Sequence, residues 1–216
     1  MRRAEDLDAV TVDAMGTLVE LDDAPGRLRA ALAEAGIERS REEVATAFLA
    51  EVEYYLPRTL EGRDEATLAD LRRRCTAVFL ERADADLDPE GFVPAFAGAI
   101  VFRPLGGAAR ALLRLRRAGL ALACVSNWDV SLVPQLERVG LRALFTEVVS
   151  SAEAGAAKPD PAVFATALSR LGVPPERALH IGDGDADRDG AAAAGLAFAP
   201  VPLATLPERL GLGRLP

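Results

Sequence analysis

Three aspartates follow short apolar segments at a spacing that suits a reaction centre. Asp13 ends one apolar stretch and precedes Gly16, while Asp183 and Asp187 lie four residues apart behind another stretch. Carboxylate oxygens bind hard cations such as Mg²⁺, and a carboxylate can also act as a nucleophile. Lys158 is the only lysine among 25 basic residues, and its compact charge suits a phosphate group. Together these are the residue types that a phosphoryl-handling site requires.

Two further polar residues, Ser126 and Asn127, stand at the end of another apolar run. In open parallel sheets, ligands bind beyond the carboxyl ends of the strands, where loops and helix N-termini converge. We therefore expect these two side chains to meet Asp13, Lys158 and Asp183 at one edge of a sheet.

Short apolar runs alternate with helical patterns over most of the chain. The runs are at residues 11–13, 120–125, 147–150, 178–181 and 196–200. Between the later runs, apolar residues recur at helical spacing, at residues 107–117, 130–139, 161–171 and 187–194. This alternation is typical of βαβ units. The predicted fold class is therefore α/β, with a core built on a parallel sheet.

A long segment without a convincing strand follows the first run. Its pattern predicts amphipathic helices at residues 25–35, 42–55 and 65–83. An all-helical insertion is therefore expected at residues 21–97, with residues 1–20 and 98–216 forming the core. Pro94, Gly98 and Pro104 are expected to mark the hinge region where the chain returns to the sheet.

The overall composition limits the classes of partner. The formal net charge is −8 and the pI is near 4.9, which disfavours nucleic acid, since phosphate backbones need a basic face. No apolar run reaches the length of a membrane span, and acids interrupt the N-terminal segment, unlike a signal peptide. The chain has only two cysteines, so we expect two free thiols in a reducing compartment. We expect a cytoplasmic monomer or homodimer with no membrane or nucleic-acid partner.

Four motifs in order resemble the haloacid dehalogenase superfamily of hydrolases. They are DAMGTL, VSN, KPDPAVF and HIGDGDADRDGAAAAG. Each motif alone is a weak signal, but the ordered set with this spacing is specific. The resemblance is to the subfamily with a helical C1 cap inserted after the first strand. It implies a Rossmann-like core, a Mg²⁺ cofactor and a small phosphorylated metabolite as the substrate.

The resemblance assigns roles to individual residues. Asp13 would be the nucleophile that forms an aspartyl-phosphate, Lys158 would neutralise charge, and the Thr17 hydroxyl would fix the Asp13 side chain. Ser126, Asn127 and Gly16 would contact the substrate. The metal site would comprise Asp13, the backbone carbonyl of Met15, Asp183 and Asp187. His180, in contrast, is interpreted as a structural strand residue too close to the sheet interior to act as a base.

The sequence departs from the family's phosphatases at Met15, where a second aspartate usually protonates the leaving group. A positioned acid or base typically contributes ~10²–10⁴-fold in rate. Three hypotheses follow: a Mg²⁺-dependent phosphohydrolase with restricted leaving groups, a 2-haloacid dehalogenase, and a weakly active protein that binds a metal or phosphometabolite. Dehalogenases of this family need a cap arginine near a tyrosine, whereas residues 45–55 contain Tyr54 and no arginine, and their fourth motif is less acidic. The phosphohydrolase is therefore favoured.

Overall fold

The computed structural model describes residues 3–213 and divides into two compact units. The first unit comprises Met1–Glu20 and Pro104–Pro216, and the second comprises Leu21–Arg103. The second junction thus follows Arg103, six residues beyond the expected one at residue 97. Residues 1–2 and 214–216 of the expected core lie outside the described residues.

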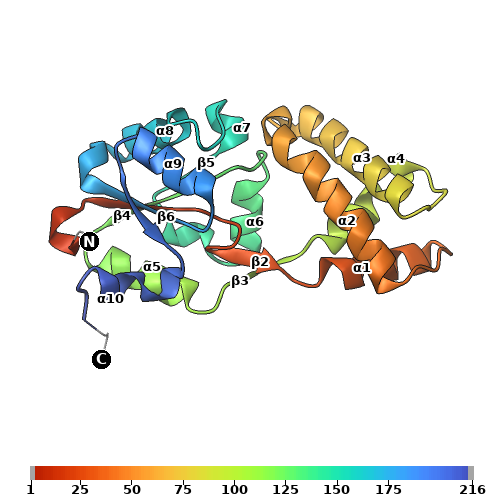
Figure 1. Ribbon diagram of the computed structural model, residues 1–216, viewed down its shortest axis with the longest axis horizontal. Helices are drawn as coiled ribbons and strands as arrows, with labels where there is room; N and C mark the ends of the chain where they lie inside the picture. Colours follow the sequence, from red (N-terminus) through yellow and green to blue (C-terminus); the bar gives the residue numbers. More distant parts are fainter. Residues whose placement is uncertain (1–2, 214–216) are drawn as a thin grey trace. The chain divides into compact units, whose positions relative to one another are not determined.

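A five-stranded parallel sheet forms the centre of the first unit (Figure 1). Its strands are β1 (Ala9–Val12), β4 (Ala121–Ser126), β5 (Glu147–Ser150), β6 (Ala178–Gly182) and β7 (Ala197–Pro200), in the order β5-β4-β1-β6-β7. Nearly every residue of β1, β4 and β6 is buried, because both faces of a parallel sheet are covered. The predicted α/β class and Rossmann-like core are confirmed.

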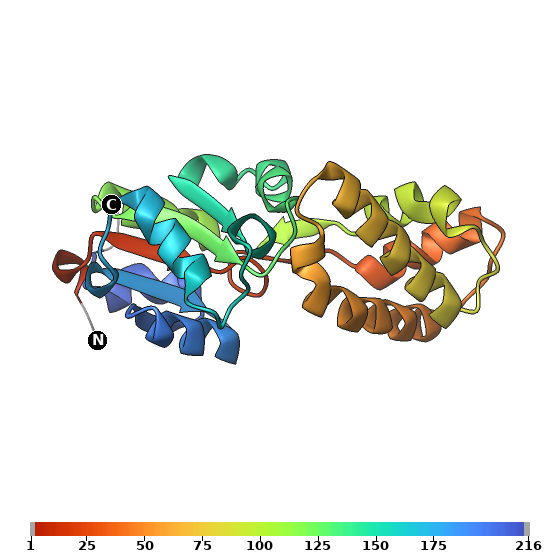
Figure 2. The same ribbon diagram turned by 90° about the horizontal axis from the view of Figure 1, so that it is seen from above.

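Helices on both sides of the sheet provide this cover (Figure 2). On one face, α8 packs against β4 and β5, and α9 packs against β6 and β7. That face holds a core cluster that includes Ala9, Val125, Val149, Phe164 and Ala191. The helices of the first unit are α5 (Ala108–Arg117), α6 (Leu132–Arg138), α7 (Ser151–Ala154), α8 (Ala162–Leu171), α9 (Asp185–Ala193) and α10 (Leu206–Arg209). Short 3₁₀ turns are η1 (Ala4–Asp6), η3 (Arg142–Leu144), η4 (Pro175–Arg177) and η5 (Leu203–Thr205).

The second unit is helical and has its own core. It contains α1 (Ala24–Glu34), α2 (Arg41–Tyr55), η2 (Leu56–Glu61), α3 (Glu65–Arg82) and α4 (Pro89–Ala99). Local signals define the helix ends: Ser40 and Glu43 form a capping box at the start of α2. Phe79 and Phe96 pack with ring centroids 5.2 Å apart. The chain enters and leaves this unit through β2 (Val19–Leu21) and β3 (Phe102–Pro104), which pair as a two-stranded sheet.

Helix α4 corrects the sequence prediction for this part of the chain. Pro94 and Gly98 were expected to mark a hinge, but both lie inside α4, and only Pro104 lies at the junction of the units. A proline inside a helix loses one backbone hydrogen bond. Burial of Phe92 and Phe96 in the helical core offsets that loss, which local propensity cannot reveal.

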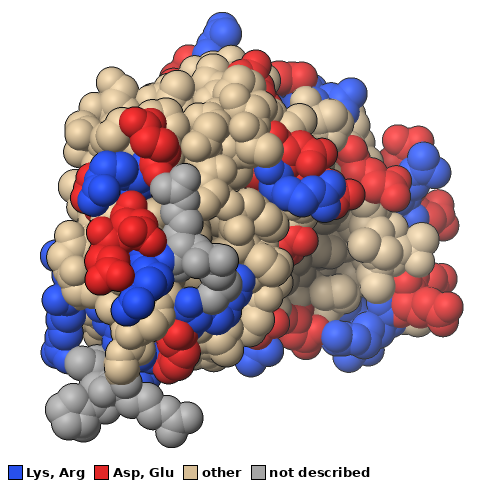
Figure 3. All heavy atoms as spheres, turned by 60° about the vertical axis from the view of Figure 1, so that its left-hand side comes forward, with Lys and Arg blue, Asp and Glu red and all other residues tan. Residues whose placement is uncertain are grey.

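Two surface observations bear on partners. Within the described residues, no helix combines the length and the apolar composition needed to cross a membrane. On the face drawn in Figure 3, acidic and basic side chains are interspersed rather than gathered into one large basic area. Mixed charge of this kind differs from the basic patch that nucleic-acid binding uses.

Candidate active site

The site begins where three neighbouring strands of the first unit end. Residue Val12 of β1 is in register with Cys124 of β4 and with Ile181 of β6. The next residue, Asp13, donates its backbone N–H to the Ile181 carbonyl at 2.9 Å. Since β1 lies between β4 and β6 and the sheet order reverses beside it, this edge is the topological switch point where ligands bind.

The Asp13 carboxylate is buried and held through one of its oxygens. Ser126 Oγ donates to Asp13 Oδ1 at 2.9 Å, and Lys158 Nζ donates to the same oxygen at 2.5 Å. Both partners are themselves buried. Within the described part of the chain, these are the hydrogen bonds of the Asp13 side chain, so Oδ2 is the oxygen left to react or to bind a cation.

Lys158 is fixed at both its ammonium and its backbone. Its Nζ also donates to Asp187 Oδ1 at 2.5 Å and to the Val125 carbonyl at 3.1 Å, which uses all three ammonium protons. The Asn127 amide forms a reciprocal pair with the Lys158 backbone: Oδ1 accepts from N–H at 2.7 Å, and Nδ2 donates to the carbonyl at 2.9 Å. Asn127 was expected to contact substrate, and its observed contacts position the lysine.

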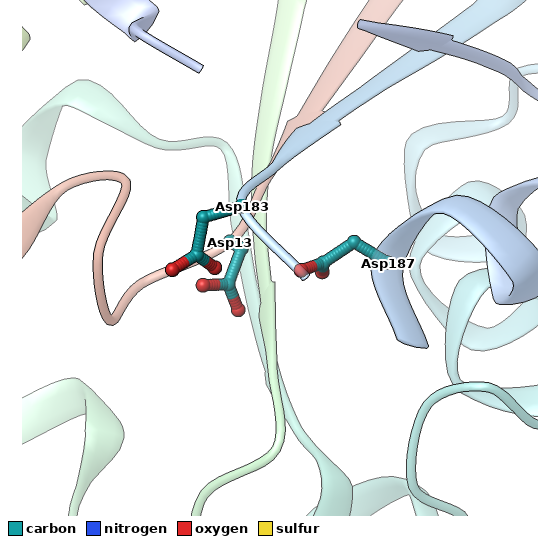
Figure 4. A group of neighbouring side chains, drawn as sticks. All are labelled: Asp13, Asp183 and Asp187. Atoms are coloured by element: carbon teal, nitrogen blue, oxygen red, sulfur yellow. The ribbon is translucent and has the colours of Figure 1, made fainter. Parts of the chain in front are cut away.

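Three carboxylates converge at this edge of the sheet (Figure 4), and two of them accept from Lys158 Nζ. Asp13, Asp183 and Asp187 each offer an oxygen, and these atoms lie within 4.8 Å of one another. Asp13 and Asp187 are buried, whereas Asp183 is exposed. A set of oxygen donors at this spacing suits a hard cation such as Mg²⁺. The donors present therefore fit the cation that the sequence predicts.

Two glycines make this convergence sterically possible. A Cβ on Gly182 would lie 2.3 Å from Cγ of Asp187, so only glycine lets Asp187 pack against the end of β6. A Cβ on Gly16 would lie 2.1 Å from Oδ2 of Asp183, and the φ of Gly16 is +75°. The other acids of the motif, Asp185 and Asp189, instead form ion pairs with Arg188.

The electrostatics of the site follow from burial opposed by charge pairing. Burial lowers the pKa of Lys158, but Asp13 and Asp187 outweigh it and raise that pKa overall. Burial raises the pKa of Asp183, and the neighbouring Asp13 and Asp187 raise it further. Burial also opposes ionisation of Asp187, but the hydrogen bond from His180 and the charge of Lys158 hold its pKa below the usual range. A cation would relieve the remaining repulsion among the carboxylates.

His180 is the residue whose connection to the site the sequence did not reveal. It lies on β6 and is fully buried, as expected for a strand residue. Its Nε2, however, lies 2.9 Å from Asp187 Oδ1, and its Nδ1 lies 2.8 Å from Thr11 Oγ1. The available signal was that the only histidine of the chain is seven residues before Asp187. That spacing alone does not indicate contact, which arises because α9 packs against β6.

The remaining residues of the first motif lie in the turn after β1. Met15 has 37% of its surface exposed, and the Gly16 N–H donates to the Val19 carbonyl at 2.9 Å. Thr17 Oγ1 is buried and has no hydrogen-bond partner among the described residues. The expected Thr17–Asp13 hydrogen bond is therefore not formed. A buried hydroxyl without a partner costs free energy that a ligand oxygen would recover.

The chain resembles known hydrolases over most of its length. Residues 7–195 match the family of haloacid dehalogenase-like hydrolases. The chain is 43% identical over 102 residues to Haloacid dehalogenase-like hydrolase domain-containing protein 3 of Bos taurus, which covers 47% of this chain and 41% of that protein. It is 44% identical over 87 residues to the glyceraldehyde 3-phosphate phosphatase of Methanopyrus kandleri. That match covers 39% of this chain and 37% of that protein. The chain thus spans less than half the length of these curated relatives.

A solved structure extends the likeness to three dimensions. The L-2-haloacid dehalogenase of Xanthobacter autotrophicus with covalently bound chloropropionic acid superposes with a TM-score of 0.68. The identity is 26%, and the match covers 97% of this chain and 85% of that one. Phosphatases and dehalogenases are thus both among the proteins that this chain resembles.

Proposed function

We propose that this chain, which belongs to the haloacid dehalogenase-like hydrolases, is a Mg²⁺-dependent phosphohydrolase acting on a small phosphorylated metabolite. The observation that carries the proposal is the arrangement around Asp13. One of its oxygens is held by Ser126 and Lys158, and its carboxylate lies within a cluster that also contains Asp183 and Asp187. A nucleophile fixed beside a buried ammonium and a cation site suits phosphoryl transfer.

The residues support a two-step reaction. Asp13 Oδ2 attacks phosphorus, the bond to the leaving oxygen breaks with its electron pair, and an aspartyl-phosphate forms. Water then attacks the same phosphorus, which releases phosphate and restores the Asp13 carboxylate. Lys158 and Ser126 hold Oδ1 throughout, while the Thr17 hydroxyl is available to a phosphoryl oxygen. Mg²⁺ held by Asp13, Asp183, Asp187 and the Met15 carbonyl would neutralise phosphoryl charge.

Met15 narrows the choice of substrate. A thioether neither donates a proton to the leaving oxygen nor activates water, so the first motif lacks its proton donor. Substrates whose leaving group is stable as an anion, such as acyl or aryl phosphates, should therefore react faster than alkyl phosphates. An acid supplied by another part of the chain would remove this preference.

We further propose that the helical unit, Leu21–Arg103, is a C1-type cap that determines substrate choice, and that the first unit carries the chemistry. The name of the Methanopyrus kandleri relative, a glyceraldehyde 3-phosphate phosphatase, supports a small phosphorylated substrate. Both cysteines are buried thiols rather than a disulfide, which supports a cytoplasmic location.

The second candidate is a 2-haloacid dehalogenase. Two observations favour it. A halide leaving group needs no proton donor, so a methionine at position 15 is compatible with dehalogenation. The Xanthobacter autotrophicus dehalogenase also shares the fold at 26% identity. The acidic cluster argues against it, because Asp183 and Asp187 would repel a carboxylate substrate unless a cation were bound. The phosphohydrolase accounts for the cluster, so we favour it.

One experiment separates the candidates. Purified protein is assayed with a panel of phosphorylated metabolites and acyl, aryl and alkyl phosphates, with and without Mg²⁺, and in parallel for chloride release from 2-haloacids. We expect Mg²⁺-dependent phosphate release that Asp13→Asn abolishes and Asp183→Asn weakens. Asp185→Asn is the matched control, because Asp185 pairs with Arg188 outside the cluster.

Each outcome of the panel is informative. Chloride release without Mg²⁺ would select the dehalogenase. No turnover above the Asp13→Asn background would refute both enzymes and leave the third hypothesis, a protein that binds a metal or phosphometabolite.

A further inference from the structure

A buried polar chain extends from the carboxylate cluster into the sheet, beyond the residues that the proposed reaction uses. Thr11 and His180 are adjacent in register on β1 and β6, and both are fully buried. The imidazole lies against Phe164, with ring centroids 4.8 Å apart in an edge-on arrangement. Buried polar groups in such an apolar environment cost free energy unless their hydrogen bonds are made, and both ring nitrogens of His180 have partners.

The partners of His180 determine how its ring is oriented. Asp187 is ionised and only accepts, so the proton between the two residues lies on His180 Nε2, 2.9 Å from Asp187 Oδ1. The other ring nitrogen, Nδ1, lies 2.8 Å from Thr11 Oγ1 and 3.1 Å from the Thr11 carbonyl oxygen. Thr11 thus holds the ring in the orientation that points the Nε2–H at Asp187.

Asp187 is consequently held from three sides. Oδ1 accepts from His180 Nε2 and from Lys158 Nζ, while Oδ2 accepts from the Gly184 N–H at 3.1 Å. Without the imidazole, Oδ1 would be held by the lysine alone, and that lysine also holds Asp13. The side chain would then be able to leave the orientation in which its oxygens face Asp13 and Asp183.

We propose that Thr11 and His180 are positioning residues that orient Asp187 for cation binding. The pair contacts neither the substrate nor the cation and acts through the carboxylate. This inference rests on the proposed Mg²⁺ site. Partners that orient a metal ligand in this way typically contribute about 10–100-fold in metal affinity, whereas a histidine that only fills space would contribute none.

The test measures Mg²⁺ binding by calorimetry, without substrate, in four variants. His180→Leu removes the donor to Asp187, His180→Gln keeps an N–H with comparable reach, and Thr11→Val removes only the hydroxyl that contacts Nδ1. Thr76→Val is the matched control, because Thr76 is an equally buried threonine whose hydroxyl donates within α3. We expect about 10–100-fold weaker binding in His180→Leu, a smaller loss in Thr11→Val, partial recovery in His180→Gln and no change in Thr76→Val.

A spectroscopic measurement reports directly on whether Nε2 carries the proton. His180 is the only histidine of the chain, so the two ring ¹⁵N signals in an NMR spectrum are unambiguous. We expect a proton on Nε2 in the wild-type protein, and a weaker hydrogen bond from that nitrogen to Asp187 in Thr11→Val. An unprotonated Nε2 in the wild type would overturn the inference.

The outcomes also separate this inference from the proposed function. Normal Mg²⁺ affinity in both Thr11→Val and His180→Leu, with binding by the wild type, would overturn only the positioning role. A wild-type protein that binds no Mg²⁺ would overturn the proposed function and this inference with it. Thr11→Val preserves side-chain volume, so the test stands if His180→Leu does not fold. At saturating Mg²⁺, kcat should fall less than the affinity for Mg²⁺.

Discussion

Glu51 makes the stability of the helical unit depend on pH in an unusual direction. It lies on α2 within the buried face of that helix and is 7% exposed. Burial raises its pKa from 4.5 to about 7, and a hydrogen bond with Cys75 offsets only part of that effect. Because the folded state binds the proton more tightly than the unfolded state, stability is greatest below pH 4.5 and falls as the pH rises towards 7.

The magnitude follows from the two pKa values. A tenfold change in proton affinity is worth about 1.4 kcal/mol, so the change from 4.5 to about 7 corresponds to about 3 kcal/mol of lost stability. His180 acts in the opposite direction below pH 6.5, because burial lowers its pKa. The raw pH profile therefore mixes both effects, and a variant is needed to isolate Glu51.

Glu51→Gln supplies the comparison. Its amide resembles the protonated acid, so its stability should equal that of the wild type near pH 4.5 and exceed it by about 3 kcal/mol at pH 8. Urea unfolding followed by far-UV circular dichroism at pH 4.5–8 measures this difference. Glu53→Gln, at an exposed position on the same helix, is the control. A constant difference between Glu51→Gln and the wild type at every pH would refute the reasoning.

Three further predictions concern the site itself. Met15→Asp should raise turnover of alkyl phosphates by up to ~10²–10⁴-fold, as measured by phosphate release; an unchanged rate would mean that another group supplies the proton. Lys158→Met should lower kcat by about 10²–10³-fold, because the charge beside Asp13 is lost. An unchanged kcat in steady-state kinetics at saturating Mg²⁺ would mean that Lys158 is dispensable. Gly16→Ala should displace Asp183, since the added Cβ would lie 2.1 Å from its Oδ2. Because the φ of Gly16 is +75°, where alanine is strained, thermal unfolding should also show a loss of about 1–3 kcal/mol. The response of the variant to Mg²⁺ should be diminished, and a response as large as that of the wild type would contradict this steric account.

The five strands of the parallel sheet were predictable because their signal is local, whereas β2 and β3 were not predicted. Each buried run, such as residues 120–125, is apolar on both faces of the sheet, and this composition is visible without knowledge of any partner. Helix α4 was missed for the opposite reason. Pro94 and Gly98 disfavour a helix locally, and only the packing of Phe92 and Phe96 in the core of the helical unit outweighs that preference.

The sequence by itself determined the α/β class, the order of the motifs and the identity of the acids, because alternating apolar runs and residue types are properties of the chain alone. The tertiary structure decided which atoms meet. Asn127 binds the Lys158 backbone, and His180 binds Asp187, because parallel strands and the helices packed on them bring together residues that are distant in sequence. Strand register and helix packing set these contacts through burial and hydrogen-bond geometry, which composition and spacing do not encode.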